Sequence, residues 1–432
     1  MSAVRSVEEH LRAVRSLLAP VLARLAEGEP DRLGIDHDGL AGRVSAGEVR
    51  AAFPLPPFDN SQMDGYAVRA ADLSGASGER PVELPVGYAT AAGDAPLVHR
   101  GGTASPVMTG AAMPRGADAV VPVEATRGGR FPSLVRGVDA AGGTAAPRER
   151  PAGTVVFDAP VVCGAFVRAR GEDLEADAVV VRRGARLSPA RIGALAAAGV
   201  VEVLVRRRPR VLVCATGDEL AARGGRLLPG RIHDANTPML AALLRSAGAI
   251  VRTTRCADRP EALRALIERT GDADLVVTSG GISAGAFEVV REALAPLGAE
   301  FASVAMQPGG PQGLGLIERS GGAGPLPVLC FPGNPVSTAL SAELFLLPAL
   351  REAAGLPGER PRERRALAHD VSSPPRKLQL RRGRVAPDGA VSVTAPGSHL
   401  LGDLADADVI VEIPVGVSRA SAGTIVDTWR IA

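Results

Sequence analysis

The chain has 432 residues, with 49 Lys and Arg against 47 Asp and Glu and a formal net charge of +2. This balance excludes a global field that would recruit nucleic acid or an anionic membrane, and aromatic residues, at 3%, are too few to stack on bases. The length suffices for roughly three domains, each with its own core. Lys377 is the only lysine, so an anion must be held by arginine, a metal or backbone N–H groups.

The cysteines and the apolar runs limit the class of protein further. Cys163, Cys214, Cys256 and Cys330 are far apart, which fits neither a zinc site nor a disulfide framework. No apolar run reaches membrane-spanning length, and no signal peptide precedes the first amphipathic segment. We therefore expect a cytoplasmic protein without a membrane partner.

The N-terminal part begins with a predicted helix and continues into a polar loop. Ser6-Val-Glu-Glu9 matches a capping box, and apolar residues follow at helical spacing. Residues 31–57 are predicted to be short extended segments with turns. The loop at 58–68 holds two Asp, an Asn, a Ser and a Gln, which packing does not explain. Asp64 is placed to project into a cleft, although Asx turns would account for part of the loop.

A small β domain is predicted next, from short segments broken by Gly and Pro between about Pro81 and Arg168. Thr109 is either a substrate contact or a threonine in a turn. Arg168 and Arg170 precede a Gly-Glu-Asp turn and are either a solvated cluster or close to a substrate.

Residues 188–209 contain a predicted helix and a predicted domain boundary. Ser188-Pro189 and Gly199 have the residue types of a helix start and a helix end. The polar stretch 206–209 is the predicted boundary.

Residues 210 to about 352 alternate strand and helix patterns, which predicts a mainly parallel sheet covered on both faces. Pro238 and Pro260 are each predicted at the first position of a helix, and Gly248 just past the end of one. After residue 361 the chain returns to short strands, which predicts a small C-terminal β-barrel.

The stretch from Asp274 to Leu294 is the centre of the predicted site. Leu275-Val-Val277 predicts a buried strand, and Thr278 to Gly281 are expected to end it before a helix resumes at Val289. A strand, a glycine-rich turn and a helix start present unpaired N–H groups that suit a phosphate. The same pattern is also typical of a tight turn without a ligand.

Ligands of such sheets bind beyond the carboxyl ends of the strands. Four segments with carboxylates, hydroxyls and glycines are predicted to meet there: 216–219, 258, 279–288 and 333–335.

Several segments resemble one family. Pro-Pro-Phe-Asp-Asn-Ser-Gln-Met-Asp-Gly-Tyr-Ala-Val at 56–68 is similar to the signature of the molybdopterin molybdenumtransferases, the MoeA/gephyrin family. The resemblance continues through Thr-Gly-Asp-Glu-Leu at 216–220, Ser-Gly-Gly-Ile-Ser-x-Gly at 279–285 and Pro-Gly-Asn-Pro-Val-Ser at 332–337.

The resemblance implies an enzyme that inserts molybdenum from molybdate into adenylylated molybdopterin and releases AMP, the final step of molybdenum cofactor biosynthesis. It implies a cytoplasmic homodimer and names the molybdopterin adenylyltransferase as a candidate partner. The implied fold is multidomain α/β plus β: a three-layer α/β domain (207–356), an N-terminal elongated domain (1–80 plus 166–206), an inserted β domain (81–165) and a C-terminal β-barrel (357–432).

The resemblance also implies site residues. The functional acids are Asp64, Glu219, Asp258 and Glu288, of which Glu219 and Glu288 would hold Mg²⁺, a hard cation that prefers oxygen ligands. For Glu219 alone, a carboxylate at a helix N-terminus is the other interpretation. Asp64 and Thr109 would lie opposite the phosphate loop across the dimer interface. The implied substrate contacts are Thr109, Arg168, Arg170, Thr216, Gly217, Asp218, Asp234, Asn236, Ser279, Gly280, Gly281, Ser283, Gly285, Pro332, Gly333, Asn334, Pro335 and Ser398.

Three positions depart from the family pattern. The family's Lys-Pro-Gly-Lys-Pro appears as Gln307-Pro-Gly-Gly-Pro311, without either lysine. An oxyanion must therefore find Gln307, backbone N–H groups or an arginine from elsewhere. Glu288 replaces an Asp and is one methylene longer, and Val289 replaces an aromatic residue.

Two alternative functions stay open, the first of them because of the lost lysines. One is a hydrolase that acts on a nucleotide pyrophosphate with the same α/β domain. The other is a non-catalytic scaffold or carrier, against which the retained acids argue.

Overall fold

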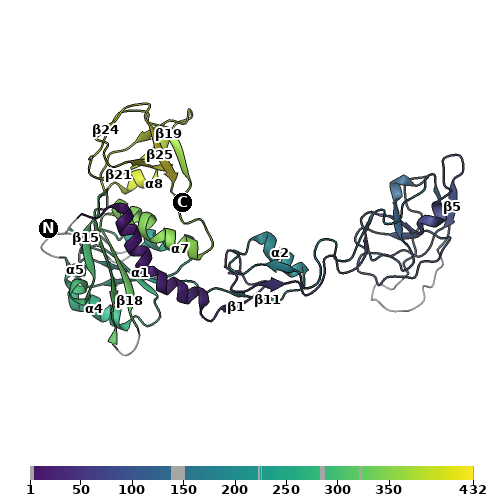
Figure 1. The fold of residues 1–432 in the computed structure, drawn as a ribbon, viewed down its shortest axis with the longest axis horizontal. Coiled ribbons are helices and arrows are strands. Elements are labelled where there is room, and N and C mark those ends of the chain that lie inside the picture. The colour runs from purple at the N-terminus through teal and green to yellow at the C-terminus, as the bar shows by residue number, and fades with distance from the viewer. Residues whose placement is uncertain are drawn as a thin grey trace. The chain divides into compact units, whose positions relative to one another are not determined.

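The computed structural model describes residues 4–137, 151–221, 224, 226–282, 288–320 and 324–431. The chain forms two compact units (Figure 1). Unit 1 comprises Met1–Gly47, Arg183–Ser188 and Val203–Ala432, and unit 2 comprises Glu48–Arg182 and Pro189–Glu202. Two units are a coarser division than the four predicted domains, whose boundaries stay a prediction.

The described residues of unit 2 form small antiparallel sheets, the α-helix α2 (Pro189–Ala197) and two short 3-10 helices, Ala70–Leu73 and Val123–Ala125. The strand pairs are β2 (Val49–Arg50) with β10 (Val179–Val181), β3 (Asn60–Ser61) with β9 (Val167–Arg168), β5 (Val82–Pro85) with β8 (Thr154–Phe157), and β4 (Gly65–Val68) between β6 (Ser105–Val107) and β7 (Ala119–Pro122). Tyr66 and Phe157 are fully buried and meet edge to face at 6.1 Å, an arrangement that aromatic pairs favour. The short strands therefore share an aromatic-centred core.

Unit 1 contains a six-stranded sheet in the order β13-β12-β14-β18-β17-β15. The first four strands are parallel, and β17 runs antiparallel to its neighbours. The bounds are β12 (Arg210–Thr216), β13 (Ile250–Cys256), β14 (Leu275–Ser279), β15 (Glu300–Ser303), β17 (Pro311–Ile317) and β18 (Leu326–Phe331). The sheet is therefore mainly parallel.

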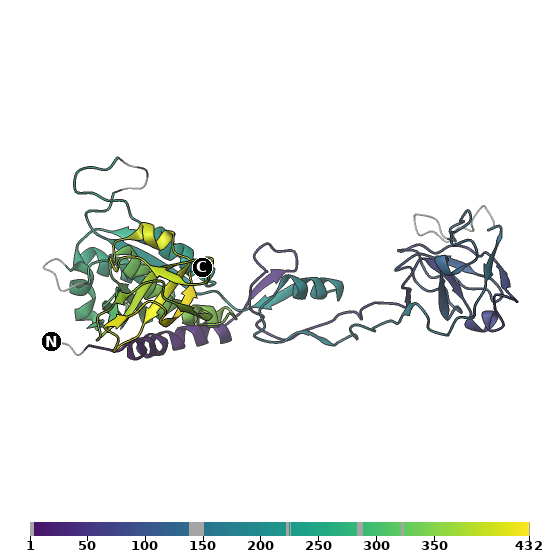
Figure 2. The same ribbon diagram turned by 90° about the horizontal axis from the view of Figure 1, so that it is seen from above.

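Alternate residues of each strand point to opposite faces of this sheet. Helices pack against both faces. Val211 and Val213 of β12 pack in one core cluster with α1, α3, α6 and α7, whereas Leu212 and Cys214 pack in a second cluster with α4 and α5. The bounds are α1 (Val7–Glu27), α3 (Asn236–Ser246), α4 (Pro260–Arg269), α5 (Val289–Leu294), α6 (Pro335–Ser341) and α7 (Leu347–Ala353), with a π-helical turn, Ala342–Leu346, between the last two. Figures 1 and 2 show α1 along the outside of unit 1.

The helix ends follow the sequence signals in most cases. The Ser6 hydroxyl accepts a hydrogen bond from the Glu9 N–H at 3.1 Å, and the Glu9 carboxylate accepts one from the Ser6 N–H at 2.8 Å, so the predicted capping box is confirmed. Pro260 is the first residue of α4, also as predicted. The prediction for Pro238 is wrong: α3 begins at Asn236, because Asp234 Oδ1 caps the chain upstream by accepting the Thr237 N–H at 3.0 Å.

The prediction that Thr278 and Ser279 end their strand is also wrong. Both residues are buried members of β14. The ladder continues through them, since Ser279 pairs with Ala215 on one side and with Phe331 on the other. Hydroxyl side chains do not interrupt a strand whose neighbours on both sides go on pairing.

The C-terminal strands surround their own apolar cluster, which includes Val391, Val411 and Ile413. A parallel bridge between Leu367 and Val391 joins the two ends of the series β19-β25-β23-β21-β22. The bounds are β16 (Met306–Gln307), β19 (Arg362–Ala366), β21 (Leu378–Val385), β22 (Val391–Val393), β23 (Val409–Ile413), β25 (Ile425–Arg430) and α8 (Leu401–Ala405). A separate C-terminal pair joins β20 (Val371–Ser372) to β24 (Arg419–Ala420). Nearer the N-terminus, β1 (Asp31–Gly34) pairs with β11 (Glu202–Val205). The expected multidomain fold of mixed sheets and helices is confirmed.

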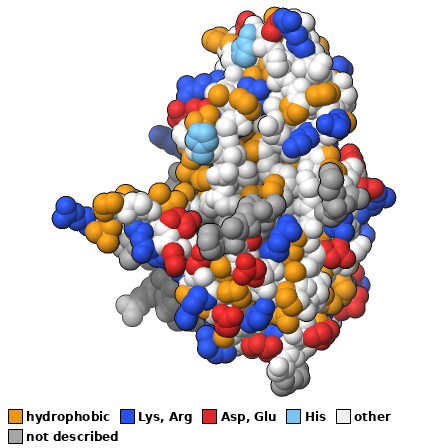
Figure 3. All heavy atoms as spheres, turned by 90° about the vertical axis from the view of Figure 1, so that its left-hand side faces the viewer, with side chains coloured by type: hydrophobic (Ala, Val, Ile, Leu, Met, Phe, Trp, Pro, Cys, Tyr) orange, Lys and Arg blue, Asp and Glu red, His pale blue; other side chains and the backbone are white. Residues whose placement is uncertain are grey.

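The surface carries both signs of charge. On the face in Figure 3, basic and acidic side chains are interspersed rather than gathered by sign. Within the described ranges, no helix combines the length and the apolar character needed to cross a membrane.

A buried ion network fixes the helix that follows β18. The Glu343 side chain, 3% exposed, accepts hydrogen bonds from Arg351 at 2.7 Å and from two nitrogens of Arg360 at 2.8 and 3.1 Å. Removal of this buried carboxylate would leave the positive charges of the two guanidinium groups without a neighbouring negative charge.

We therefore expect Glu343→Ala to lower the free energy of unfolding by about 3–5 kcal/mol. Chemical denaturation of the full chain measures this change. Glu359→Gln is the matched control, because the Glu359 side chain is 69% exposed, and its removal should change the free energy by less than about 0.5 kcal/mol. Equal effects of the two substitutions would contradict a structural role for the buried network.

Candidate functional site

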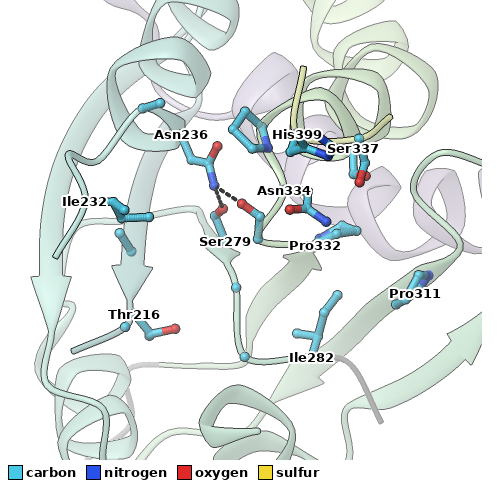
Figure 4. Close-up of a pocket in the computed structure, with 18 of the residues that line it drawn as sticks. Thr216, Ile232, Asn236, Ser279, Ile282, Pro311, Pro332, Asn334, Ser337 and His399 are labelled. Carbon is cyan, nitrogen blue, oxygen red and sulfur yellow. Dashed lines mark hydrogen bonds between the residues drawn. The ribbon is translucent and has the colours of Figure 1, made fainter. Parts of the chain in front are cut away.

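A cavity of about 970 Å³ lies at the carboxyl ends of β12, β14 and β18 (Figure 4). Parallel strands in register end at one edge of the sheet, so segments distant in sequence meet there. The C-terminal loop 396–399 forms a further part of the wall. Its carbonyl at Ser398 accepts the Val336 N–H of α6 at 3.1 Å, which fixes the loop to the start of that helix.

The strand ends are held together by one amide. Asn236 Nδ2, at the start of α3, donates to Ser279 Oγ at 2.8 Å and to the Gly333 carbonyl at 2.6 Å (Figure 4). The other polar atom of this side chain, Oδ1, is buried and has no hydrogen-bond partner among the described residues. Thr216 Oγ1 is likewise buried and has no hydrogen-bond partner among the described residues. Both residues line the cavity, and both retain unused hydrogen-bonding capacity.

Two glycines let the loops approach each other. Gly280 has φ +97°, a conformation that other residues adopt only with strain. A Cβ atom at Gly333 would lie 3.3 Å from the Gly280 Cα, closer than such atoms normally pack. The two turns therefore form one continuous wall of backbone.

The start of α5 differs from the prediction. The Gly281 carbonyl accepts both the Val290 N–H and the Arg291 N–H, each at 3.1 Å, so these two groups are not free for a phosphate. Gly281 has φ +64°, and its turn directs the carbonyl toward the helix. Ser283 and Gly285, two further predicted contacts, lie outside the described residues.

Carboxylates dominate the charge of the cavity. Glu219, Asp234, Asp258 and Glu288 line it, and its described lining contains neither Lys nor Arg. Burial raises the pKa of Asp258, and the negative charges of Asp218, Glu219, Glu288 and Glu292 raise it further. The acids are therefore close enough to repel one another.

The carboxylate of Glu219 lies against the backbone of Gly217 in the same turn. A Cβ atom at Gly217 would lie 2.5 Å from Glu219 Oε2, so the glycine leaves the space that this carboxylate occupies. No group of three or more His, Cys, Asp or Glu arranged to hold a metal ion occurs among the described residues. The carboxylates of Glu219 and Glu288 have the oxygen chemistry that a hard divalent cation needs, and further ligands would have to come from a bound phosphate.

Of the predicted residues of unit 1 that the structure describes, all but one line the cavity. Asp218 is not part of its lining. The predicted contacts that do line it are Thr216, Gly217, Asp234, Asn236, Ser279, Gly280, Gly281, Pro332, Gly333, Asn334, Pro335 and Ser398.

Sequence reasoning missed several lining residues. Ile232 and His233 lie in a loop without a motif, and Ser337 ends the Pro-Gly-Asn-Pro-Val-Ser segment without being among the predicted contacts. A parallel bridge between Ile232 and Leu220 places that loop beside the Thr-Gly-Asp-Glu turn. The spacing in sequence carries no signal of this contact.

The remaining predicted residues lie in unit 2 at exposed positions. Asp64 Oδ1 accepts hydrogen bonds from the Thr109 N–H at 2.7 Å and from its hydroxyl at 2.8 Å, so these two residues form a pair. Arg168 belongs to β9, and the Arg170 N–H donates to Asp59 Oδ1 at 2.7 Å. Their roles toward a substrate stay predictions.

Comparisons with known proteins cover nearly the whole chain. Residues 5–199 match the MoeA N-terminal region (domain I and II), residues 212–352 match a probable molybdopterin binding domain, and residues 364–431 match the MoeA C-terminal region (domain IV). Molybdopterin molybdenumtransferase 2 of Mycobacterium tuberculosis is 40% identical over 444 residues, which cover 99% of this chain and 100% of the relative. The molybdopterin molybdenumtransferase of Nostoc sp. is 33% identical over 415 residues, 92% of this chain and 88% of the relative.

A solved structure agrees with these sequence matches. The crystal structure of a molybdopterin biosynthesis MoeA protein from Pyrococcus horikoshii superimposes with a TM-score of 0.72 at 25% identity, and covers 99% of this chain and 100% of the solved chain. A second MoeA structure from the same genus reaches a TM-score of 0.77 at 30% identity, with 99% of each chain covered. Three consecutive regional matches, full-length relatives and a full-length structural match lead to one conclusion: the chain belongs to the MoeA family.

Proposed function

We propose that this chain inserts molybdenum from molybdate into adenylylated molybdopterin and releases AMP. The observation that carries the proposal is the convergence of the family's scattered motifs on one cavity, in a chain whose relatives are named molybdopterin molybdenumtransferases over their full length. The homodimer, the magnesium requirement, the cytoplasmic location and the adenylyltransferase partner belong to this proposal as predictions of family membership.

The size and the walls of the cavity fit a substrate with a pyrophosphate. Its volume of about 970 Å³ is at the upper end of the range for small-molecule sites, which suits a pterin joined to a nucleotide. The backbone wall formed by Gly280 and Gly333 allows phosphoryl oxygens to approach closely. Thr216 Oγ1 and Asn236 Oδ1 add hydrogen-bonding capacity that the protein itself does not use.

The charge of the cavity argues for a divalent cation bound together with the substrate. A pyrophosphate beside four carboxylates, without a lysine or arginine in the described lining, would be repelled. We propose that Glu219 and Glu288 hold Mg²⁺, which when bound neutralises phosphate charge and assists displacement at phosphorus. Asp258, which lines the same cavity, is the proposed acid–base residue beside them.

A nucleotide-pyrophosphate hydrolase is the second candidate, because Gln307 and Gly310 replace the family's lysines. The rate of AMP release from adenylylated molybdopterin, measured with and without molybdate, separates the two functions. A transferase should release AMP faster with molybdate present. A hydrolase would release it at the same rate in both conditions.

Glu219→Gln keeps the shape of the side chain and removes the charge proposed to hold the cation. We expect molybdate-dependent AMP release to fall by about a hundredfold, as is usual when one charge-stabilising group is lost. Glu359→Gln, at an exposed position, is the control and should retain the full rate. A Glu219→Gln rate within about twofold of the unchanged protein would rule out the proposed role.

Asp258→Asn tests the repulsion among the acids. The pKa of Asp258 is higher in the folded state than in the unfolded state. The contribution of Asp258 to the stability of the fold is therefore fully present below its unfolded-state pKa, and it is lost as the pH rises through the folded-state pKa. The Asn variant should therefore unfold at a higher temperature than the unchanged protein at neutral pH without divalent cations. This difference should shrink as the pH is lowered.

Asp370→Asn is the control of opposite sign. The Ala422 N–H and Arg419 lower the pKa of Asp370, so its contribution is present above the unfolded-state pKa and is lost as pH falls through the folded-state pKa. This variant should unfold at a lower temperature at neutral pH. If both variants moved in the same direction, the assigned charge environment of Asp258 would be wrong.

A further inference from the structure

Two cysteines that are distant in the sequence share one face of the sheet in unit 1. β12 and β13 are parallel, and their register sets Cys214 opposite Thr254 and Cys256 opposite Thr216. Side chains two positions apart on a strand point to the same face, so both thiols lie on the side that α4 and α5 cover. Cys214 belongs to the apolar cluster on this face, and Cys256 packs against it.

The two thiols differ in their access to solvent. Cys214 is fully buried in an interior strand, whereas Cys256 is half-buried at the end of β13, the edge strand of the sheet. The two thiols are hydrogen-bonded to each other, and Cys214 Sγ also lies 3.8 Å from the Ala215 carbonyl. The hydrogen bond with Cys256 raises the pKa of Cys214, and burial raises it further. Cys214 therefore stays a thiol and donates the hydrogen bond to the Cys256 sulfur.

The surroundings of Cys256 favour its thiolate. The hydrogen bond from Cys214 lowers the pKa of Cys256 to about 7, and the positive charges of Arg259 and Arg269 act in the same direction. Burial and the negative charge of Asp258 act against them. A partly exposed cysteine near positive charge is the reactive kind, because the thiolate is the nucleophile.

Cys256 stands beside the cavity without lining it. Thr216, its neighbour on β12, and Asp258, which follows it closely in the sequence, both line the cavity. A group attached to the Cys256 sulfur would therefore lie within reach of the proposed acid–base residue.

We propose that Cys256 is a site of reversible thiolation by a small-molecule disulfide, and that Cys214 is the positioning residue that holds its sulfur by a hydrogen bond. The Cys256 thiolate attacks one sulfur of the disulfide R–S–S–R. A bond forms between Cys256 Sγ and that sulfur, the S–S bond of the reagent breaks, and R–S⁻ leaves with the electron pair. Cys256 is oxidised and the leaving sulfur is reduced, and an excess of free thiol reverses the exchange. An effect of this modification on AMP release rests on the proposed function.

Oxidised glutathione and the full-length protein test the site. Cys163→Ser removes the exposed thiol of unit 2 and gives the background for every measurement. This protein should take up one glutathionyl group, at Cys256, because Cys214 and Cys330 are buried. The rate of uptake should reach half of its maximum near pH 7. Mass spectrometry of the intact protein and of its peptides measures the number, the position and the rate.

The hydrogen bond from Cys214 is tested by two substitutions in the same background. Cys214→Ala removes the donor and should move the midpoint of the pH profile upward, toward about 8.5, the pKa of a free thiol. Cys214→Ser keeps a donor of similar size, so its midpoint should lie below that of Cys214→Ala. A merely structural role of Cys214 would alter the unfolding temperature and leave the midpoint in place.

The effect on the cavity has its own measurement. Thiolated protein should release AMP from adenylylated molybdopterin at least about tenfold more slowly, since small displacements in a site cost large factors in rate. Dithiothreitol should restore the rate, and Cys256→Ser should not respond to oxidised glutathione.

A Cys256 that stays unmodified, or a pH midpoint that Cys214→Ala leaves in place, would overturn the proposal. An unchanged rate of AMP release after thiolation would overturn the effect on the cavity. If the unmodified protein released no AMP while Cys256 was still thiolated with the expected pH profile, the proposed function would fail and the modification site would stand.

Discussion

The geometry of the site depends on the register of β12, β14 and β18. It also depends on the side-chain amide of Asn236, which joins the end of β14 to the turn after β18. Thr216, Ser279 and Phe331 stand at the ends of β12, β14 and β18, and Ser279 pairs with both Ala215 and Phe331. Asn236 then ties the Ser279 hydroxyl to the Gly333 carbonyl across this edge. A slip of one residue in any of these strands would turn its side chains to the other face and separate the groups that line the cavity.

The same edge concentrates negative charge. Glu219, Asp258 and Glu288 come from three different segments of the chain. Burial and the negative charges of the neighbouring carboxylates raise the pKa of Asp258. This group of carboxylates favours a ligand that binds together with a cation, because a phosphate alone would be repelled by the negative charges.

Local patterns predicted much of the fold. The continuous apolar run of β12, the capping box at Ser6 and the proline at the start of α4 are all signals within a few residues, and the structure agrees with them. The meeting of the motifs at one edge was also predictable, because parallel topology alone requires it.

The errors and omissions come from contacts that are distant in sequence. The hydroxyl side chains of Thr278 and Ser279 predict a strand that stops at Val277, yet pairing on both sides keeps both residues in β14. The free N–H groups expected at α5 are occupied by the Gly281 carbonyl, whose direction depends on a three-dimensional turn. The bond between Gln307 and Gln379 spans 72 residues and depends on the pairing of β16 with β21, for which the two-residue strand gives no pattern.

A crystal structure of the protein with adenylylated molybdopterin tests the central claim most directly. The account predicts phosphoryl oxygens beside the backbone of Gly280 and Gly333, at the carboxyl ends of the three parallel strands. A ligand bound in another part of unit 1, with this cavity filled only by solvent, would contradict it.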